Sequence, residues 1–158
     1  MSGYKNRTNA RLSVVQAIYS TYFNEGASFS EVVDDFLSGR IGGELLEEKG
    51  ENNEIETFIP MGKTDSSLFV SIFNAWEERK EIVDNVIKEN FNDKWSVERT
   101  EKLVFSILRA AVTEMMVSDV DKPVIIDEYM KIAISFYENG QEPRMINALL
   151  DKIAKGIK

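Results

Sequence analysis

The chain has 158 residues, 43% of them hydrophobic, so it can bury the core of one domain or of two small bundles that share an interior. It contains neither cysteine nor histidine, which excludes disulfides, imidazole-based catalysis and the common zinc sites. Its net charge of −8 argues, taken as a whole, against nucleic acid as a partner. No apolar run approaches the ~20 residues of a membrane span and no signal peptide is present, so we expect a cytoplasmic protein without a membrane partner.

The first predicted helix covers residues 8–23. Its apolar residues recur at steps of three and four, the period of one helical face: Leu12, Val15, Ile18, Tyr19 and Tyr22. Gly26 can end it, because glycine readily adopts the left-handed conformation at a helix C-terminus. We expect Tyr22 in the core and Tyr19 at the core's edge, where its hydroxyl can reach a polar partner.

A second, short helix is predicted over residues 28–37, where Ser28 and Glu31 have the spacing of a capping box. Residues 39–63 then combine glycines, acidic residues and Pro60 with few apolar residues. We interpret this stretch as a long, acidic, flexible loop, because loops of this length are uncommon in compact domains unless they are functional or disordered.

The rest of the chain predicts four more helices. The third covers residues 64–90, with Thr64 or Asp65 as its cap and with Phe73 in the core. Ser96 caps the fourth, whose apolar residues run from 103 to 116. The fifth and sixth open at Pro123 and Pro143, because proline is tolerated in the first turn of a helix.

No segment shows the alternating pattern of a strand, so the fold class is predicted to be all-α, with residues 1–158 as a single domain. The sequence also lacks a phosphate-binding glycine loop, a calcium loop and any recognisable catalytic constellation. We therefore expect neither an enzyme nor a bound cofactor or metal.

The charge is distributed unevenly. Residues 31–60 hold nine acidic residues against two basic ones, a net charge of −7, whereas residues 1–12 hold only basic ones: Lys5, Arg7 and Arg11. Basic side chains at the start of a helix can neutralise RNA phosphates, and the positive end of the helix dipole adds to this attraction. From spacing alone, three positive charges more often form an ordinary solvated surface than an RNA-binding one.

Four blocks, in the same order, resemble the bacterial NusB family. Residues 10–19 (ARLSVVQAIY) are similar to its arginine-rich opening followed by AQALY, and residues 65–69 lie where its second bundle begins. Residues 95–115 contain WSVER and ILRAAVTEM, which resemble W-x-L-x-R-L and AILRLALYEL. Residues 126–154 carry its closing signature, which ends in INALLDKIA.

The resemblance implies two perpendicular three-helix bundles fused into one domain, and a non-catalytic role. NusB pairs with NusE, a small-subunit ribosomal protein, and the pair binds boxA RNA in ribosomal transcripts and helps the elongating RNA polymerase resist termination. Carried over to matching positions, the resemblance implies RNA-binding residues, to which Lys5 is added on charge alone: Arg7, Arg11, Gln16, Tyr19 and Phe136.

The chain departs from the family pattern at several positions. Thr8 and Asn9 interrupt the run of arginines, which predicts fewer phosphate contacts and a weaker salt dependence of RNA binding. Val104 and Phe105 replace a pair that includes an acidic residue, so we expect the NusE interface to lack that acid. Tyr137 replaces a glycine.

Two alternative functions remain open from the sequence. One is a stand-alone RNA-binding module like the NusB-like domain of some ribosomal RNA cytosine methyltransferases. The other is a helical protein–protein adaptor with reduced affinity for RNA, which the interrupted run of arginines favours. Because NusB proteins occur as monomers and as dimers, the sequence also leaves a homodimer open.

Overall fold

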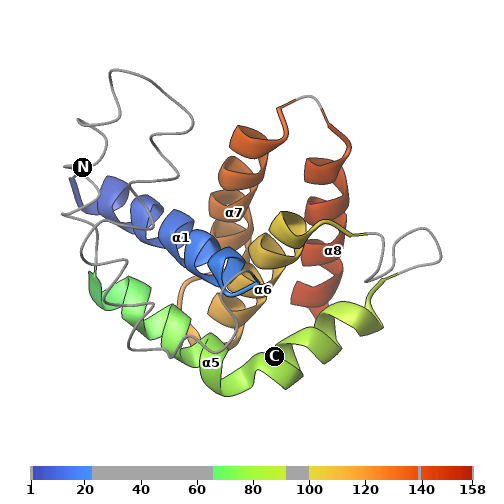
Figure 1. Cartoon of the computed structure of the whole chain (residues 1–158), viewed down its shortest axis with the longest axis horizontal. Coiled ribbons are helices and arrows are strands. Elements are labelled where there is room, and N and C mark those ends of the chain that lie inside the picture. The colour runs from blue at the N-terminus through green and yellow to red at the C-terminus, as the bar shows by residue number, and fades with distance from the viewer. Residues whose placement is uncertain (1, 23–65, 92–99, 139, 158) are drawn as a thin grey trace. The chain divides into compact units, whose positions relative to one another are not determined.

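The computed structural model describes residues 2–22, 66–91, 100–138 and 140–157, and for residues 2–6 the backbone alone. These residues form five helices (Figure 1): α1 (Ser2–Ser20), α5 (Ser66–Glu89), α6 (Lys102–Val117), α7 (Lys122–Phe136) and α8 (Glu142–Gly156). No described residue belongs to a strand, so the all-α prediction is confirmed. The helix expected over 28–37, the acidic loop over 39–63 and the caps at 64–65 lie outside the described residues.

The chain divides into two compact units, residues 1–74 and 75–158, and α5 runs through both. The first unit contains α1 and the beginning of α5. The second contains the rest of α5 together with α6, α7 and α8. That residues 1–158 form a single domain stays a prediction.

Helix α1 starts at Ser2, earlier than the expected start near residue 8. Residues 2–7 include no proline, and Lys5 and Arg7 have good helix propensity, so the helix can extend beyond its apolar face. Half of its fully buried side chains are small, and small side chains are poorly visible in a pattern of large apolar ones. The fully buried residues of α1 are Ala10, Ser13, Val14, Val15, Ala17 and Ile18. Tyr22, expected in the core, is only half-buried.

Two hydroxyl side chains mark the end of α1, which stops before the expected residue 23. The Ser20 hydroxyl donates to the Ala17 carbonyl at 2.7 Å, and the Thr21 hydroxyl donates to the Ile18 carbonyl at 2.6 Å. The last carbonyls of a helix have no partner within it, and these hydroxyls supply donors for two of them. The end of α1 is therefore fixed by local polar contacts.

Helix α5 confirms the long helix predicted over residues 64–90 and adds a kink. In the first unit Phe73 is fully buried, as expected, and its ring stacks on Phe69 with centroids 5.7 Å apart and planes 8° apart. The kink lies at Arg79, whose φ and ψ of −122° and 21° are not helical. Beside it, Lys80 lies over the Trp76 ring, 4.8 Å from the centroid.

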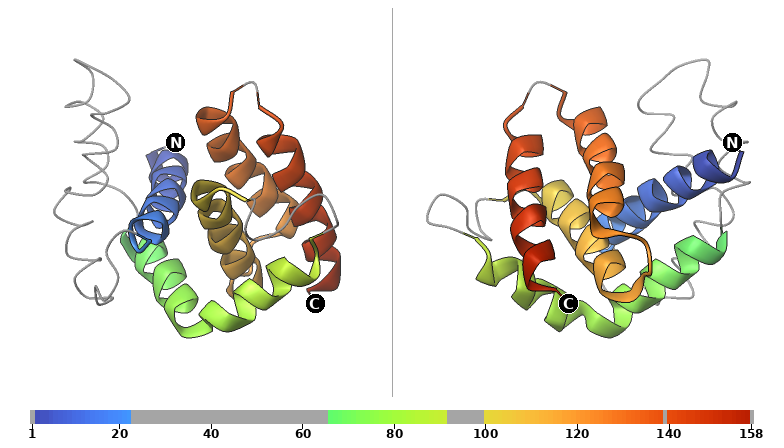
Figure 2. Two further views of the ribbon diagram at one scale, coloured as in Figure 1. Left: turned by 45° about the vertical axis from the view of Figure 1, so that its right-hand side comes forward. Right: turned by 180° about the vertical axis from the view of Figure 1, so that it is seen from behind.

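In the second unit, α6, α7 and α8 pack against one another pairwise as a three-helix bundle. Helices α7 and α8 lie side by side as a hairpin in both views of Figure 2. Pro123 and Pro143 stand in the first turns of these two helices, which confirms the predicted starts.

The predicted cap of α6, Ser96, lies outside the described residues. The helix begins at Lys102, and Glu101 before it has an extended backbone with φ −64° and ψ 149°. The apolar face of α6 begins at Leu103, one residue after the start of the helix. An acidic residue at this position is favourable, because a helix N-terminus carries partial positive charge.

Candidate functional site

The basic residues of α1 differ in their access to solvent. Arg7 is exposed, whereas Arg11 keeps only 5% of its surface exposed. Gln16 is 3% exposed, and no described residue donates a hydrogen bond to its Oε1. Lys5 lies in the first turns of α1, but its side chain is outside the described part of the chain. The predicted basic surface is therefore presented by Arg7 rather than by Arg11.

Tyr19 lies in the last turn of α1 and is half-buried, in agreement with its expected place at the edge of the core. Its ring meets Tyr22 edge to face, with centroids 6.5 Å apart and planes 60° apart. Two partly exposed aromatic rings therefore stand together at the C-terminal end of α1. Such rings can stack on the bases of single-stranded RNA.

Phe136 is the last residue of α7, in the second unit, and it is also half-buried. The next residue, Tyr137, donates its phenol hydrogen to the Glu101 carboxylate at 3.1 Å and its backbone N–H to the Ala133 carbonyl at 2.9 Å. The last turn of a helix frays easily, and these two bonds hold the turn that carries Phe136. The bond between Tyr137 and Glu101 could not be predicted from the sequence, because the two residues are distant in the chain.

Val104 and Phe105 are core residues of α6. Both are nearly fully buried, and the Phe105 ring meets Phe91 edge to face with centroids 5.8 Å apart. These positions therefore contribute packing, and neither presents a charge to a partner.

The described part of the chain offers no cluster of three or more acidic side chains placed to hold a metal ion. Among the described helices, none is both long and apolar enough to span a lipid bilayer.

The structure brings some of the predicted site residues together. Arg7, Arg11, Gln16 and Tyr19 share α1, with the two middle residues buried and the two outer ones accessible to solvent. Phe136 belongs to the other unit. The burial of Arg11 and Gln16 could not be read from the sequence, because arginine and glutamine are usually exposed.

Comparison with known proteins gives consistent results. The NusB family model matches residues 8–155. Transcription antitermination protein NusB from Rhodospirillum rubrum is 34% identical over 163 residues, covering 99% of this chain and 88% of that protein. The protein of the same name from Sinorhizobium fredii is 36% identical over 153 residues, covering 96% of this chain and 88% of its own length.

The fold agrees with these relationships. A solved structure of T. maritima NusB is similar with a TM-score of 0.67 at 23% identity, over 96% of this chain and 92% of that one. The predicted NusB-like helical fold is thus confirmed. From the match over residues 8–155 and the near full-length identity to its relatives, this chain belongs to the NusB family of transcription antitermination proteins.

Proposed function

We propose that this protein is an RNA-binding antitermination factor that pairs with NusE, a small-subunit ribosomal protein, on the boxA RNA of ribosomal transcripts. In this role it acts in the cytoplasm and reaches the elongating RNA polymerase through the RNA and NusE. The observation that carries the proposal is the family match over nearly the whole chain. The exposed Arg7 in the second turn of α1 supports it, because an accessible cation can neutralise an RNA phosphate.

The role that we propose for each residue of α1 follows from its exposure to solvent. Arg7, with Lys5 added on charge, would contact phosphates. Arg11 and Gln16 are buried, so their contribution to RNA binding would come from holding α1 in place rather than from direct contact. Tyr19 and Phe136 each expose part of an aromatic ring and would stack on bases, a contact worth ~1–3 kcal/mol per base.

The adaptor alternative also has a specific observation in its favour. Because Arg11 is buried, α1 presents fewer cations to RNA than its sequence contains. Under this alternative the protein binds NusE but gives RNA no added affinity.

The test is a titration of the full-length protein into fluorescently labelled boxA RNA, with and without its cognate NusE, at two salt concentrations. We expect binding that strengthens with NusE and weakens with salt. Replacing Arg7 by alanine should lower the slope of log affinity against log salt by about 0.7, the value for one phosphate contact on a single strand. Lys88→Ala, which removes an exposed lysine of α5, is the matched control and should leave the slope unchanged.

Binding of NusE without any binding of RNA, in the wild type and at both salt concentrations, would refute the RNA role and leave the adaptor. A failure to bind either partner would refute both.

A further inference from the structure

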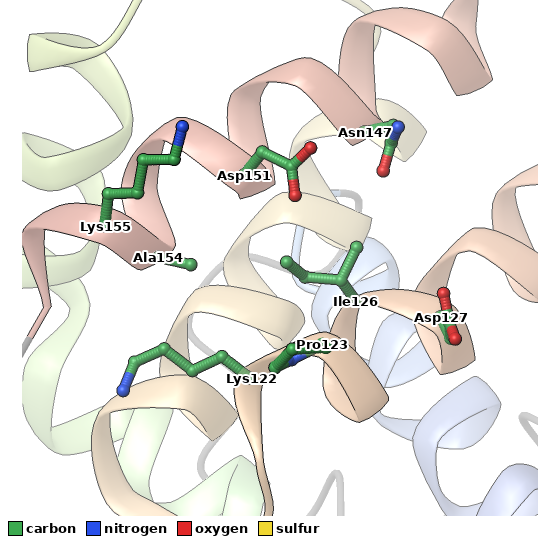
Figure 3. A pocket seen from close by; sticks show the side chains of 8 residues that line it. All are labelled: Lys122, Pro123, Ile126, Asp127, Asn147, Asp151, Ala154 and Lys155. Carbon is green, nitrogen blue, oxygen red and sulfur yellow. The ribbon is translucent and has the colours of Figure 1, made fainter.

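Helices α7 and α8 border an open hollow of about 340 Å³ in the second unit (Figure 3). It lies between the first turns of α7 and the later turns of α8. Eight residues line it: Lys122, Pro123, Ile126 and Asp127 from α7, and Asn147, Asp151, Ala154 and Lys155 from α8. None of them is among the predicted RNA-binding residues, so the hollow is separate from the RNA contacts proposed above.

The basic and acidic residues that line the hollow lie at different ends of it. Figure 3 shows Lys122 and Lys155 at one end, and Asp127 and Asn147 at the other. Asp151 lies between Asn147 and Lys155, as its place on α8 requires, and the apolar side chain of Ile126 points into the middle. The hollow therefore has a basic end, an apolar floor and an acidic end.

The polar side chains around the hollow do not form hydrogen bonds or ion pairs within the described part of the chain. Elsewhere in the second unit, Asp84 pairs with Arg109 and Glu128 with Lys131. By contrast, the five polar side chains of the hollow make no hydrogen bond or ion pair with any residue that the structure describes. Asp151 and Lys155 do not pair with each other, although they stand four residues apart on α8. Their hydrogen-bonding capacity is available to a ligand.

The acidic end indicates which functional group the ligand carries. Two carboxylates and one side-chain amide, contributed by two helices, offer several acceptor oxygens. A guanidinium group suits them best, because it carries five N–H donors in one plane and is less strongly hydrated than an ammonium group. Its aliphatic stem can cover Ile126 and Pro123. RNA does not fit this end, since carboxylates repel phosphates.

We propose that the hollow binds an arginine-bearing segment of a protein partner. The guanidinium lies against Asp127, Asp151 and Asn147, and the arginine stem covers Ile126. An acidic side chain of the same segment lies beside Lys122 and Lys155. The charges of the segment thus complement both ends of the hollow.

The test uses N-acetyl-arginine amide as the probe and the full-length protein labelled for NMR. The readouts are the side-chain amide of Asn147 and the methyl groups of Ile126. We expect saturable shifts at both residues. N-acetyl-citrulline amide has nearly the same shape without the charge, and it should bind roughly tenfold more weakly or not at all, since hydrogen bonds to charged groups are the stronger ones.

Variants then locate the site. The double variant Asp127→Asn with Asp151→Asn should lower the affinity for the arginine probe about tenfold or more. The matched control is Asp119→Asn, which replaces an exposed aspartate before α7 and outside the hollow. It should leave the affinity for the arginine probe unchanged. All three aspartates are exposed, so the variants should fold normally, which the amide spectrum reports directly.

A third comparison tests the basic end. The peptide acetyl-Glu-Ala-Ala-Arg-amide should bind several-fold more tightly than its Gln-Ala-Ala-Arg counterpart, and Lys122→Ala with Lys155→Ala should remove that difference. Equal shifts with citrulline and arginine, or an unchanged affinity in the double aspartate variant, would overturn the proposal. Saturable shifts with inorganic phosphate, without any with arginine, would make the hollow an anion site instead.

Discussion

Arg109 of α6 donates two hydrogen bonds to the carboxylate of Asp84 of α5, from Nε to Oδ1 at 2.8 Å and from Nη2 to Oδ2 at 3.0 Å. The two side chains are only 17% and 25% exposed, and the guanidinium also lies over the Phe105 ring, 5.0 Å from its centroid. This fork joins α5 to α6 within the second unit. Its strength depends on the planar geometry of the guanidinium, which lysine does not have.

The first prediction follows from that geometry. Arg109→Lys keeps the charge but loses the second hydrogen bond and the flat contact with Phe105. We expect the free energy of unfolding to fall by roughly 1–2 kcal/mol in urea denaturation. Glu77→Gln, which breaks the more exposed pair of Glu77 with Lys80, is the control and should cost less than about 0.5 kcal/mol. Equal losses in the two variants would show that the fork adds nothing beyond a surface ion pair.

The second prediction compares two tyrosine hydroxyls. Tyr129 donates to the fully buried Glu114 at 2.9 Å, whereas Tyr137 donates to Glu101 at the surface. Tyr129→Phe should lower the free energy of unfolding by about 1–3 kcal/mol, because it removes a donor from a buried carboxylate. Tyr137→Phe should change it by less than about 0.5 kcal/mol. Thermal and urea unfolding of the two variants side by side would measure the difference, and a larger loss at Tyr137 would contradict it.

The third prediction concerns the apolar core of the bundle. Leu150 of α8 is fully buried, and Ile134 of α7 is 50% exposed. Leu150→Ala should lower the free energy of unfolding by about 2–5 kcal/mol, since it removes buried methyl groups and leaves a cavity. Ile134→Ala should stay within about 0.5 kcal/mol of the wild type. Urea denaturation gives both values, and a cost below 1 kcal/mol at Leu150, by the same scale, would mean that α8 packs more loosely than described.

The outcomes at particular residues show what the sequence could reveal. Pro123 and Pro143 marked the starts of α7 and α8 correctly, because proline acts on the backbone at its own position. The small residues that bury α1 were missed, since alanine and serine give a weak periodic signal.

The candidate site was less predictable than the fold. Arg11 matched a basic motif, but its burial depends on packing by residues distant in sequence. The hollow between α7 and α8 had no sequence signal at all. Its charged residues are spaced like those of any solvated helix surface, and only the packing of the two helices makes them neighbours.

The fourth prediction separates stability from function at Gln16. This side chain is buried, and its Oε1 receives no hydrogen bond from the described residues. Gln16→Met has a similar size and no unmet acceptor, so the free energy of unfolding should rise by roughly 1 kcal/mol. If Gln16 serves RNA binding, the same variant should weaken binding of boxA RNA. A stabilised variant with unchanged RNA affinity would remove Gln16 from the site, and a destabilised one would refute the stability argument.

The fifth prediction tests the aromatic contact at Phe136. Phe136→Leu keeps an apolar side chain and removes the ring, so affinity for boxA RNA should fall by ~1–3 kcal/mol if a base stacks there. Fluorescence anisotropy with labelled RNA measures the loss. Phe91→Leu changes an aromatic residue that packs on Phe105 and serves as the control for general effects of ring removal. An equal loss in the control would mean that Phe136 acts through folding.

Helix α6 has buried side chains on every face, from Val104 to Leu108 and from Ala110 to Met115. Two of its buried polar residues, Ser106 and Thr113, donate their hydroxyls to carbonyls of their own helix, at 2.8 and 2.7 Å. These two hydroxyls therefore need no partner outside α6. The amide protons of its buried middle, from Val104 to Met115, should exchange more slowly than those of α1's first turns, which can fray alone.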